Sequence, residues 1–478
     1  MKRLFFIVVI FLVAFSSDGQ SIGINESGIA PNKSAQLDIN STSKGLLIPR
    51  MSTAQRKAIP NAAAGLLVFD LDKSTIYLYD GENWQAMLFT NSGNNNPPIG
   101  RSATDGSPVD KFGTSVNISG DYAVIGAPLD DIGTNADQGA AYIFVRQGGT
   151  WSQQVKLTAA DGAAGDNFGT SVSISGDYAI VGSPKGSGAW FLQGAAYIFV
   201  RTGTNWVQQV KLNASDGLIG DYFGTSVSIS GNDVIVGSPG AAVKYASQGA
   251  AYVFIRNGSS WVQQSKLTVS FGEYNEKFGF SVSINGDYAI GGAPYRDVNG
   301  YPTDVGVAYI FARTGTTWTL QTPLSHSGGF SDYNFGYSVS ISGDYAVVGE
   351  PGGYTAPYAQ SGVVYVYLRT GVNWALQQTL NAFDAEAEAS FGVSCCIDAS
   401  KIIIGSFFKN AGANPYQGAA YLYHRSGTAW SIIRKLDDAS GQYSGQFGNA
   451  VGVSGFNYII GAVGKNNYQG EVSFLNTE

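Results

Sequence analysis

One motif recurs seven times along this chain of 478 residues, and its fixed spacing constrains the fold more than any other feature. The copy at residues 168–184 reads Phe-Gly-Thr-Ser-Val-Ser-Ile-Ser-Gly-Asp-Tyr-Ala-Ile-Val-Gly-Ser-Pro. In every copy the glycine that opens a Gly-Ala-Pro-like element follows 14 residues after the phenylalanine. A constant period of 55 to 57 residues is typical of repeat architectures. The units start near Phe112, Phe168, Phe223, Phe278, Phe335, Phe391 and Phe447.

Each unit has the pattern of four β-strands. In the second unit we expect strands at residues 171–175, 178–183, 194–201 and 206–212. The first has small side chains that suit an innermost position, the next two are apolar throughout, and the fourth alternates apolar residues with Gln and Lys like an outer edge. Radially arranged four-stranded antiparallel sheets form a β-propeller. The sequence therefore predicts an all-β fold, with a seven-bladed propeller over residues 101–478.

The seventh unit lacks a fourth strand of its own. In six units a tryptophan lies 17 residues before the next Phe-Gly pair, whereas the residue 17 before Phe112 is Asn95, in a proline-containing segment that makes a poor strand. The segment from Trp84 to Thr90 is a better strand candidate. We expect this segment, or one near it, either to complete the ring or to belong to a separate N-terminal module.

The N-terminus has the features of an export signal. Residues 1–20 combine two basic residues, 12 apolar residues and a small, polar end, as a secretory signal peptide does. Twelve apolar residues are too few to span a bilayer as a helix, and no later stretch is long enough. We therefore expect a secreted or cell-surface protein with no membrane span, a small module at residues 21–90 and a linker at residues 91–100.

Two resemblances support this division of the chain. Residues 21–25, 44–51 and 79–84 resemble the leader regions of many secreted and surface proteins of Bacteroidetes, some of them fibre-like. The Phe-Gly pairs, the Gly-Ala-Pro elements at 126–128 and 292–294 and the Gly-Ala-Ala-Tyr-Ile-Phe runs resemble the FG-GAP repeat family. That family is known from integrin α-subunit propellers and many bacterial exported proteins. The resemblance implies a propeller fold.

A calcium site of the family is not expected here. Calcium-binding members carry an Asp-x-Asp-x-Asp-Gly loop between the first two strands, which supplies several oxygen ligands. The corresponding turn in this chain is only Ser-Gly-Asp-Tyr, with a single carboxylate. We therefore expect no metal and no cofactor. The repeated acids Asp105, Asp110, Asp161, Asp166, Asp216 and Asp221 are interpreted as turn residues, with a weak cation site as the alternative.

Nothing in the sequence selects an enzymatic mechanism. His326 and His424 lack metal-ligand spacing, and there is neither a nucleophile elbow nor a phosphate-binding loop. A carboxylate pair for glycoside cleavage remains open because acids are plentiful. The net charge of −7, without a basic stretch, argues against nucleic acid as a partner. We expect no catalytic residues.

Variable loops on a repeated rigid frame are where binding usually resides. The connections from strand two to three and from strand four to one should share one face, and their contents differ between units. An alternative is that their aromatic residues only pack the loops onto the disc. The candidate ligand-binding residues on this face are Trp190, Phe191, Tyr245, Tyr295, Arg296, Tyr354 and Phe408.

The leading hypothesis is an exported, surface-associated adhesion or binding propeller that recognises a protein or a glycan through this face. A structural component of an extracellular assembly, oligomerising through residues 21–90, is one alternative. A hydrolase acting on polysaccharide is another.

Overall fold

The computed structural model describes residues 22–25, 37–40, 46–72, 75–87, 97–186, 191–297, 304–326, 332–410, 415–438 and 442–477. The chain divides into two compact units, Met1–Met87 and Leu88–Glu478, which are described separately. The predicted signal peptide, residues 1–20, lies outside the described residues.

The first unit contains a small four-stranded sheet in the order β3-β4-β5-β6 and a parallel pair, β1 with β2. Ser52 starts the helix with a capping box, because its side chain accepts from the Gln55 amide while the Gln55 side chain accepts from the Ser52 amide. Arg56 forms a buried ion pair with Asp70 at 2.8 Å. The elements are β1 (Ile22–Asn25), β2 (Leu37–Asn40), β3 (Arg50–Met51), α1 (Thr53–Lys57), β4 (Leu67–Asp70), β5 (Thr75–Tyr79) and β6 (Trp84–Met87).

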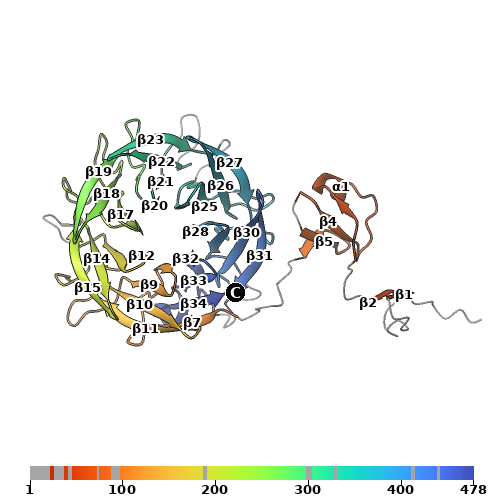
Figure 1. The fold of residues 1–478 in the computed structure, drawn as a ribbon, viewed down its shortest axis with the longest axis horizontal. Helices are drawn as coiled ribbons and strands as arrows, with labels where there is room; N and C mark the ends of the chain where they lie inside the picture. Colours follow the sequence, from red (N-terminus) through yellow and green to blue (C-terminus); the bar gives the residue numbers. More distant parts are fainter. Residues whose placement is uncertain are drawn as a thin grey trace, which may run out of the picture. The chain divides into compact units, whose positions relative to one another are not determined.

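The second unit, called the propeller below, consists of seven four-stranded antiparallel sheets arranged radially (Figure 1). The expected all-β fold of repeated four-stranded sheets is confirmed. The sheets are numbered blades 1 to 7, and in each the first strand lies innermost and the fourth lies at the rim. The innermost strands are β8 (Ser115–Ser119), β12 (Ser171–Ser175), β16 (Ser226–Ser230), β20 (Ser281–Asn285), β24 (Ser338–Ser342), β28 (Ser394–Asp398) and β32 (Phe447–Ser454).

The middle strands of each blade are buried on both faces, as their apolar sequences predict. The second strands are β9 (Tyr122–Ala127), β13 (Tyr178–Ser183), β17 (Asp233–Ser238), β21 (Tyr288–Ala293), β25 (Tyr345–Glu350), β29 (Lys401–Ser406) and β33 (Asn457–Ala462). The third strands are β10 (Ala140–Gln147), β14 (Ala195–Thr202), β18 (Ala250–Asn257), β22 (Val307–Thr314), β26 (Val363–Thr370), β30 (Ala419–Ser426) and β34 (Glu471–Asn476).

The outer strands are half-exposed, and a bulge interrupts their pairing with the third strand in blades 1 to 6. A short helix, α2 (Lys465–Tyr468), connects the second and third strands of blade 7. The fourth strands are β11 (Thr150–Leu157), β15 (Asn205–Leu212), β19 (Ser260–Leu267), β23 (Thr317–Leu324), β27 (Asn373–Leu380), β31 (Ala429–Asp437) and β7 (Ile99–Arg101).

The structure decides between the two roles expected for the segment that starts at Trp84. The segment starting at Trp84 does not complete the ring, because β6 pairs with β5 in the first unit. The fourth strand of blade 7 is instead β7, which pairs with β34 in antiparallel register. Two of its three residues fall within the predicted linker. The sequence pattern missed this strand because three residues can complete a ladder through backbone groups alone, without the tryptophan that marks the other fourth strands.

Neighbouring blades meet through the backbone of the repeated motif. The amide of Phe168 donates to the carbonyl of Gln138 in blade 1 at 2.9 Å, and Ser115 Oγ of blade 1 donates to the carbonyl of Gly169 at 2.8 Å. The same serine contact recurs from blade to blade through blade 6. Between blades 7 and 1, Asn449 Nδ2 replaces the serine and donates to the carbonyl of Gly113 at 3.0 Å. Since β32 also contacts β8, the innermost strands form a continuous ring.

The Ser-Gly-Asp-Tyr turns join blades on the opposite face. In blade 1 the ring of Tyr122 lies 4.5 Å from the Arg201 guanidinium carbon and 6.1 Å from the Trp206 ring, both of blade 2. Arg201 also forms an ion pair with Asp177 of its own blade. Equivalent arginine–tyrosine contacts join blades 2 to 3, 4 to 5 and 5 to 6. The single carboxylate of the turn therefore has an arginine partner, and the tyrosine contributes a cation–π contact between blades.

The contact between blades predicts unequal effects of two Gly→Ala substitutions. A Cβ at Gly182 would overlap the carbonyl of Gly224 in blade 3, whereas a Cβ at Gly203, in a turn with φ +64, meets nothing. We expect Gly182→Ala to lower the free energy of unfolding by about 3 kcal/mol or more, through overpacking. Gly203→Ala should cost only about 1 kcal/mol, through its left-handed backbone. Urea denaturation measures both losses of unfolding free energy, and equal losses for the two variants would contradict the close contact between Gly182 and Gly224.

Candidate functional site

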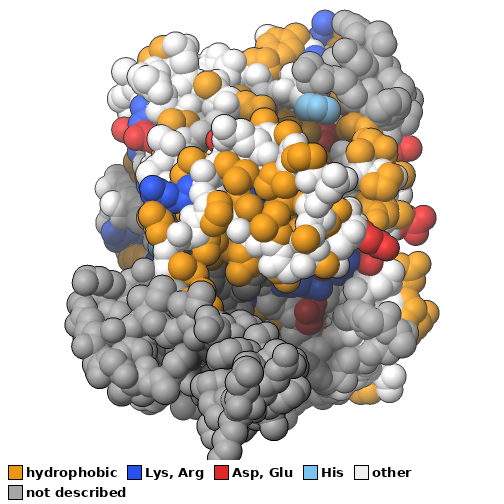
Figure 2. All heavy atoms as spheres, turned by 90° about the vertical axis from the view of Figure 1, so that its right-hand side faces the viewer, with side chains coloured by type: hydrophobic (Ala, Val, Ile, Leu, Met, Phe, Trp, Pro, Cys, Tyr) orange, Lys and Arg blue, Asp and Glu red, His pale blue; other side chains and the backbone are white. Residues whose placement is uncertain are grey.

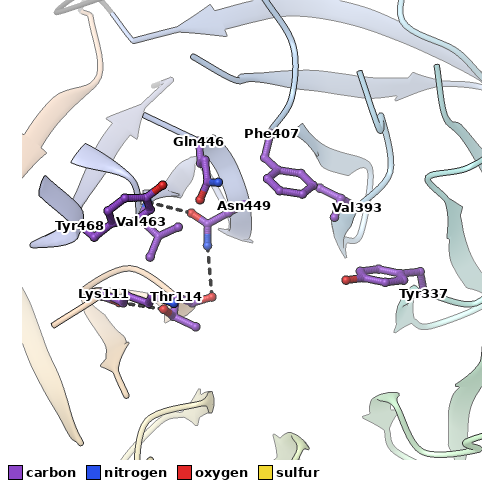
Figure 3. A pocket seen from close by; sticks show the side chains of 9 residues that line it. All are labelled: Lys111, Thr114, Tyr337, Val393, Phe407, Gln446, Asn449, Val463 and Tyr468. Carbon is purple, nitrogen blue, oxygen red and sulfur yellow. Dashed lines mark hydrogen bonds between the residues drawn. The ribbon is translucent and has the colours of Figure 1, made fainter. Parts of the chain in front are cut away.

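A cavity of about 550 Å³ opens where the innermost strands of blades 1, 5, 6 and 7 begin (Figure 3). It therefore lies at one mouth of the central channel, on the face that carries the variable loops. Its walls differ in chemistry, since aromatic and aliphatic side chains stand opposite a group of mostly polar ones. The lining residues, here called the mouth residues, are Lys111, Thr114, Tyr337, Val393, Phe407, Gln446, Asn449, Val463 and Tyr468.

The aromatic wall is supported by a second layer of rings. The Tyr337 ring centroid lies 4.9 Å from that of Phe280, which in turn contacts Tyr295 at 5.8 Å. Phe407 stacks on Phe408 with centroids 3.9 Å apart. These contacts fix the orientation of Tyr337 and Phe407, so the wall is a preformed surface rather than a set of independent side chains.

The polar wall contains two kinds of group. Asn449 is fully engaged, since it donates to Gly113 and accepts from the amide of Val463 at 3.2 Å. Within the described part of the chain, by contrast, no hydrogen bond or ion pair engages the Lys111 ammonium, the Gln446 amide or the Tyr337 hydroxyl. The Tyr468 hydroxyl is equally without a partner there. These groups remain available to a ligand.

Lys111 sets the charge of the site. It is the sole charged residue among the described mouth residues, and no Asp or Glu lines the cavity. Its backbone has φ +57, in the left-handed region, where Asn167 and Asn334 stand in the second and fifth units. The cavity therefore favours a ligand with negative charge or hydrogen-bond acceptors over a cation.

The predicted site residues have different positions relative to this cavity. Phe408 belongs to the second layer, behind Phe407, and Tyr295 lies behind Phe280. Trp190 lies outside the described residues. Three others are exposed on loops and do not line the cavity, and their binding role stays a prediction: Phe191, Tyr245 and Tyr354.

Arg296 is directed into the protein. Its side chain is only 14% exposed, its Nη1 lies 3.4 Å from a carboxylate oxygen of Glu276, and it also donates to the Tyr309 hydroxyl. Arg296 therefore makes its contacts within blade 4. Its binding of a ligand stays a prediction.

Sequence reasoning missed the mouth residues because they are brought together from units far apart in the chain. The signal that could have found them is divergence at fixed positions of the repeat. The third residue of the Gly-Ala-Pro element is Pro in five units but Phe407 and Val463 in the last two. The residue two after the repeated phenylalanine also varies: Thr114, Thr170, Thr225, Phe280, Tyr337, Val393 and Asn449.

Comparison with known families gives the same division of the chain. The model of the FG-GAP repeat matches residues 102–144, 151–199, 206–254, 261–311, 318–367 and 374–423, which together exceed half of the chain. The chain belongs to the FG-GAP repeat family. A second model, of a phage tail like trimerisation region, matches residues 23–97. A comparison with curated proteins gave no match.

The repeated acids of this FG-GAP propeller have internal partners. Asp216 accepts from Tyr252 at 2.9 Å and pairs with Lys266 at 2.7 Å. Burial alone would raise the pKa of Asp216. The contacts with Lys266 and Tyr252 outweigh burial and hold this pKa below its ordinary value. Asp105, Asp161 and Asp384 make similar tyrosine and lysine contacts. Asp110, Asp166 and Asp221 instead accept backbone amides of their own loops. Each of these acids therefore has a partner within the protein.

Searches for other sites concern only the described residues. Among them, no group of three or more His, Cys, Asp or Glu residues is placed to hold a metal ion. No helix in this part of the chain is sufficiently long and apolar to cross a membrane.

Blade 5 of the FG-GAP propeller replaces the usual Asp–Lys pair with a buried Glu350 and His326. Glu350 occupies the position of a small residue in the Gly-Ala-Pro element, and its Oε1 lies 3.7 Å from His326 Nδ1. Tyr365 donates to Glu350 Oε2 at 2.8 Å. Burial raises the pKa of Glu350 to about 8, against the lowering effect of Tyr365, and burial lowers the pKa of His326. Both groups are therefore neutral near pH 7.

The raised pKa of Glu350 predicts that stability falls as pH rises from about 4.5 to about 8, because only the unfolded chain releases this proton there. The lowered pKa of His326 has the opposite effect, because stability falls as the pH falls below the ordinary pKa of histidine. We expect Glu350→Ser, the residue of blade 2, to stabilise the protein by about 3 kcal/mol more at pH 8 than at pH 5, at about 1.4 kcal/mol per pKa unit.

Urea denaturation at both pH values measures this difference. Ser183→Ala, at the same position of blade 2, is the matched control and should show no such pH dependence. A stabilisation by Glu350→Ser that is equal at both pH values would contradict the raised pKa.

Proposed function

We propose that this protein is an exported, cell-surface-associated binding protein of the adhesion type, which captures a protein or a glycan at the variable loop face of a seven-bladed propeller. The observation that carries the proposal is the cavity at the channel mouth. The Lys111 ammonium, the Gln446 amide and the hydroxyls of Tyr337 and Tyr468 have no partner among the described residues, and the aromatic wall is preformed. A site of this kind, concave and with a few convergent polar groups, is the usual form of a ligand pocket.

A non-enzymatic role is supported by the chemistry of the cavity. Glycoside cleavage generally needs two carboxyl groups about 5 to 10 Å apart. None of the described mouth residues is Asp, Glu, His or Cys, so the cavity provides neither a carboxylate pair nor an obvious general base. A hydrolase would have to use a different surface of the molecule.

Oligomerisation through the N-terminal region is part of the proposal. Residues 23–97 match a trimerisation region, and Leu46, Leu47 and Leu71 are 65%, 72% and 52% exposed there. On the side of the molecule that Figure 2 shows, hydrophobic side chains are exposed among the described residues. Burial of the three leucines between copies would stabilise a trimer through the hydrophobic effect. The same region favours the second candidate function, a structural component of an extracellular assembly.

A trimer would present three propellers to one surface and so raise the apparent affinity through avidity. We expect the double substitution Leu46→Glu and Leu47→Glu to convert a trimer into a monomer, as measured by light scattering after size exclusion. Its capture by a panel of immobilised glycans and extracellular-matrix proteins should weaken at least about tenfold. Leu376→Glu, at a leucine of the outer strand β27 that is 51% exposed, is the control.

Two outcomes would contradict the proposal. Binding to no member of the panel by the wild-type trimer would remove the adhesion function and leave the structural candidate. If the wild-type chain is monomeric, the proposed trimer is wrong. Repeating the capture in EDTA tests the expected absence of a calcium site, which predicts unchanged binding.

A further inference from the structure

We propose that the cavity at the channel mouth binds a carboxylated sugar unit of an acidic glycan. The inference rests on the proposed binding function and names its ligand class. It follows from three properties of the mouth residues: a lysine without a partner, a preformed aromatic wall, and several free hydroxyl and amide groups.

The first property is the charge of Lys111. Some other lysines of the propeller are paired with acids, as Lys211 is with Asp161 at 2.7 Å and Lys266 with Asp216 at 2.7 Å. Lys111 has no carboxylate partner among the described residues, although the chain carries a net charge of −7. An ammonium group without a partner gains from an anionic one, and a carboxylate on the ligand provides it.

The second property is the aromatic wall. Tyr337 and Phe407 stand on the same side of the cavity with Val393 between them, opposite Lys111 and Thr114 (Figure 3). A pyranose ring has an apolar face of C–H groups that packs against such rings. The ring contacts from Phe280, which is tilted against Tyr337, and from Phe408, which stacks on Phe407, reduce the cost of ordering the wall when the ligand binds.

The third property is the set of free polar groups. The Gln446 amide both donates and accepts, and the hydroxyls of Tyr337 and Tyr468 do the same. Sugar hydroxyls also donate and accept, and a single ring presents several of them within a few ångströms. A carboxylated pyranose therefore satisfies the lysine, the rings and the hydroxyls together. A neutral sugar leaves Lys111 unpaired, and an acidic peptide side chain offers too few hydroxyl partners within the cavity.

Isothermal titration of the full chain with hexagalacturonate tests this inference, with cellohexaose as the neutral probe of equal length. We expect binding of hexagalacturonate that weakens with added salt, and at least tenfold weaker binding of cellohexaose. Lys111→Asn places in unit 1 the residue of units 2 and 5, so it preserves the left-handed backbone, and it should weaken hexagalacturonate binding at least tenfold. Lys185→Asn makes the same change at an exposed lysine in the loop after β13, outside the cavity, and should leave binding unchanged.

Two further variants separate the ring from its hydroxyl. Tyr337→Phe removes only the hydroxyl and should weaken binding several-fold, whereas Tyr337→Thr, the residue of units 1 to 3, also removes the ring and should weaken it more. Both replacements occur at this position elsewhere in the repeat, and thermal unfolding of each variant verifies its folding.

The inference is overturned if wild-type protein ignores hexagalacturonate, if Lys111→Asn binds it as well as the wild type, or if cellohexaose binds equally. Binding of hexaglutamate in its place, with the same sensitivity to Lys111→Asn, would assign a peptide ligand and overturn it too. Capture by matrix proteins or neutral glycans without hexagalacturonate binding would leave the proposed function standing. Loss of all capture would remove both.

Discussion

The close approach of glycine backbones between neighbouring blades is the constraint on which the propeller depends. The Phe-Gly pair of one blade lies against the Gly-Ala-Pro glycine of the preceding blade, where no Cβ fits. This contact explains why glycine recurs at fixed positions while other residues drift. The same contact limits where a binding site can form, because the residue directly after each Phe-Gly pair lies at the channel mouth. Four of these residues, Thr114, Tyr337, Val393 and Asn449, line the cavity.

Ring closure and the candidate site share one seam. Blades 1 to 6 use a serine hydroxyl to bridge to the next blade, whereas Asn449 bridges blade 7 to blade 1 with an amide. Its amide oxygen also holds Val463, another mouth residue. Lys111 lies on the other side of this seam, and its backbone amide bonds to the carbonyl of Tyr468. The residues that close the ring therefore also fix the polar wall of the cavity.

Much of the fold follows from the sequence because strand pairing in each blade is local and repeats with a constant period. The strands of blade 2, for example, lie within a residue of their predicted positions. The closing strand at Ile99–Arg101 was missed because its pairing with β34 joins the two ends of the propeller and leaves no side-chain pattern. The cavity was missed for a related reason. Lys111 and Gln446 are far apart in the chain, and only the ring brings them together.

The division between scaffold and binding site can be tested by replacing mouth residues with the residues that other units of the repeat carry. A triple variant, Lys111→Asn, Tyr337→Thr and Phe407→Val, gives these positions residues that the same repeat positions carry in other units. We predict that its thermal unfolding matches that of the wild type within a few degrees, while its capture by the panel of glycans and matrix proteins is lost. Capture at wild-type strength by a folded triple variant would contradict the assignment of ligand binding to the channel mouth.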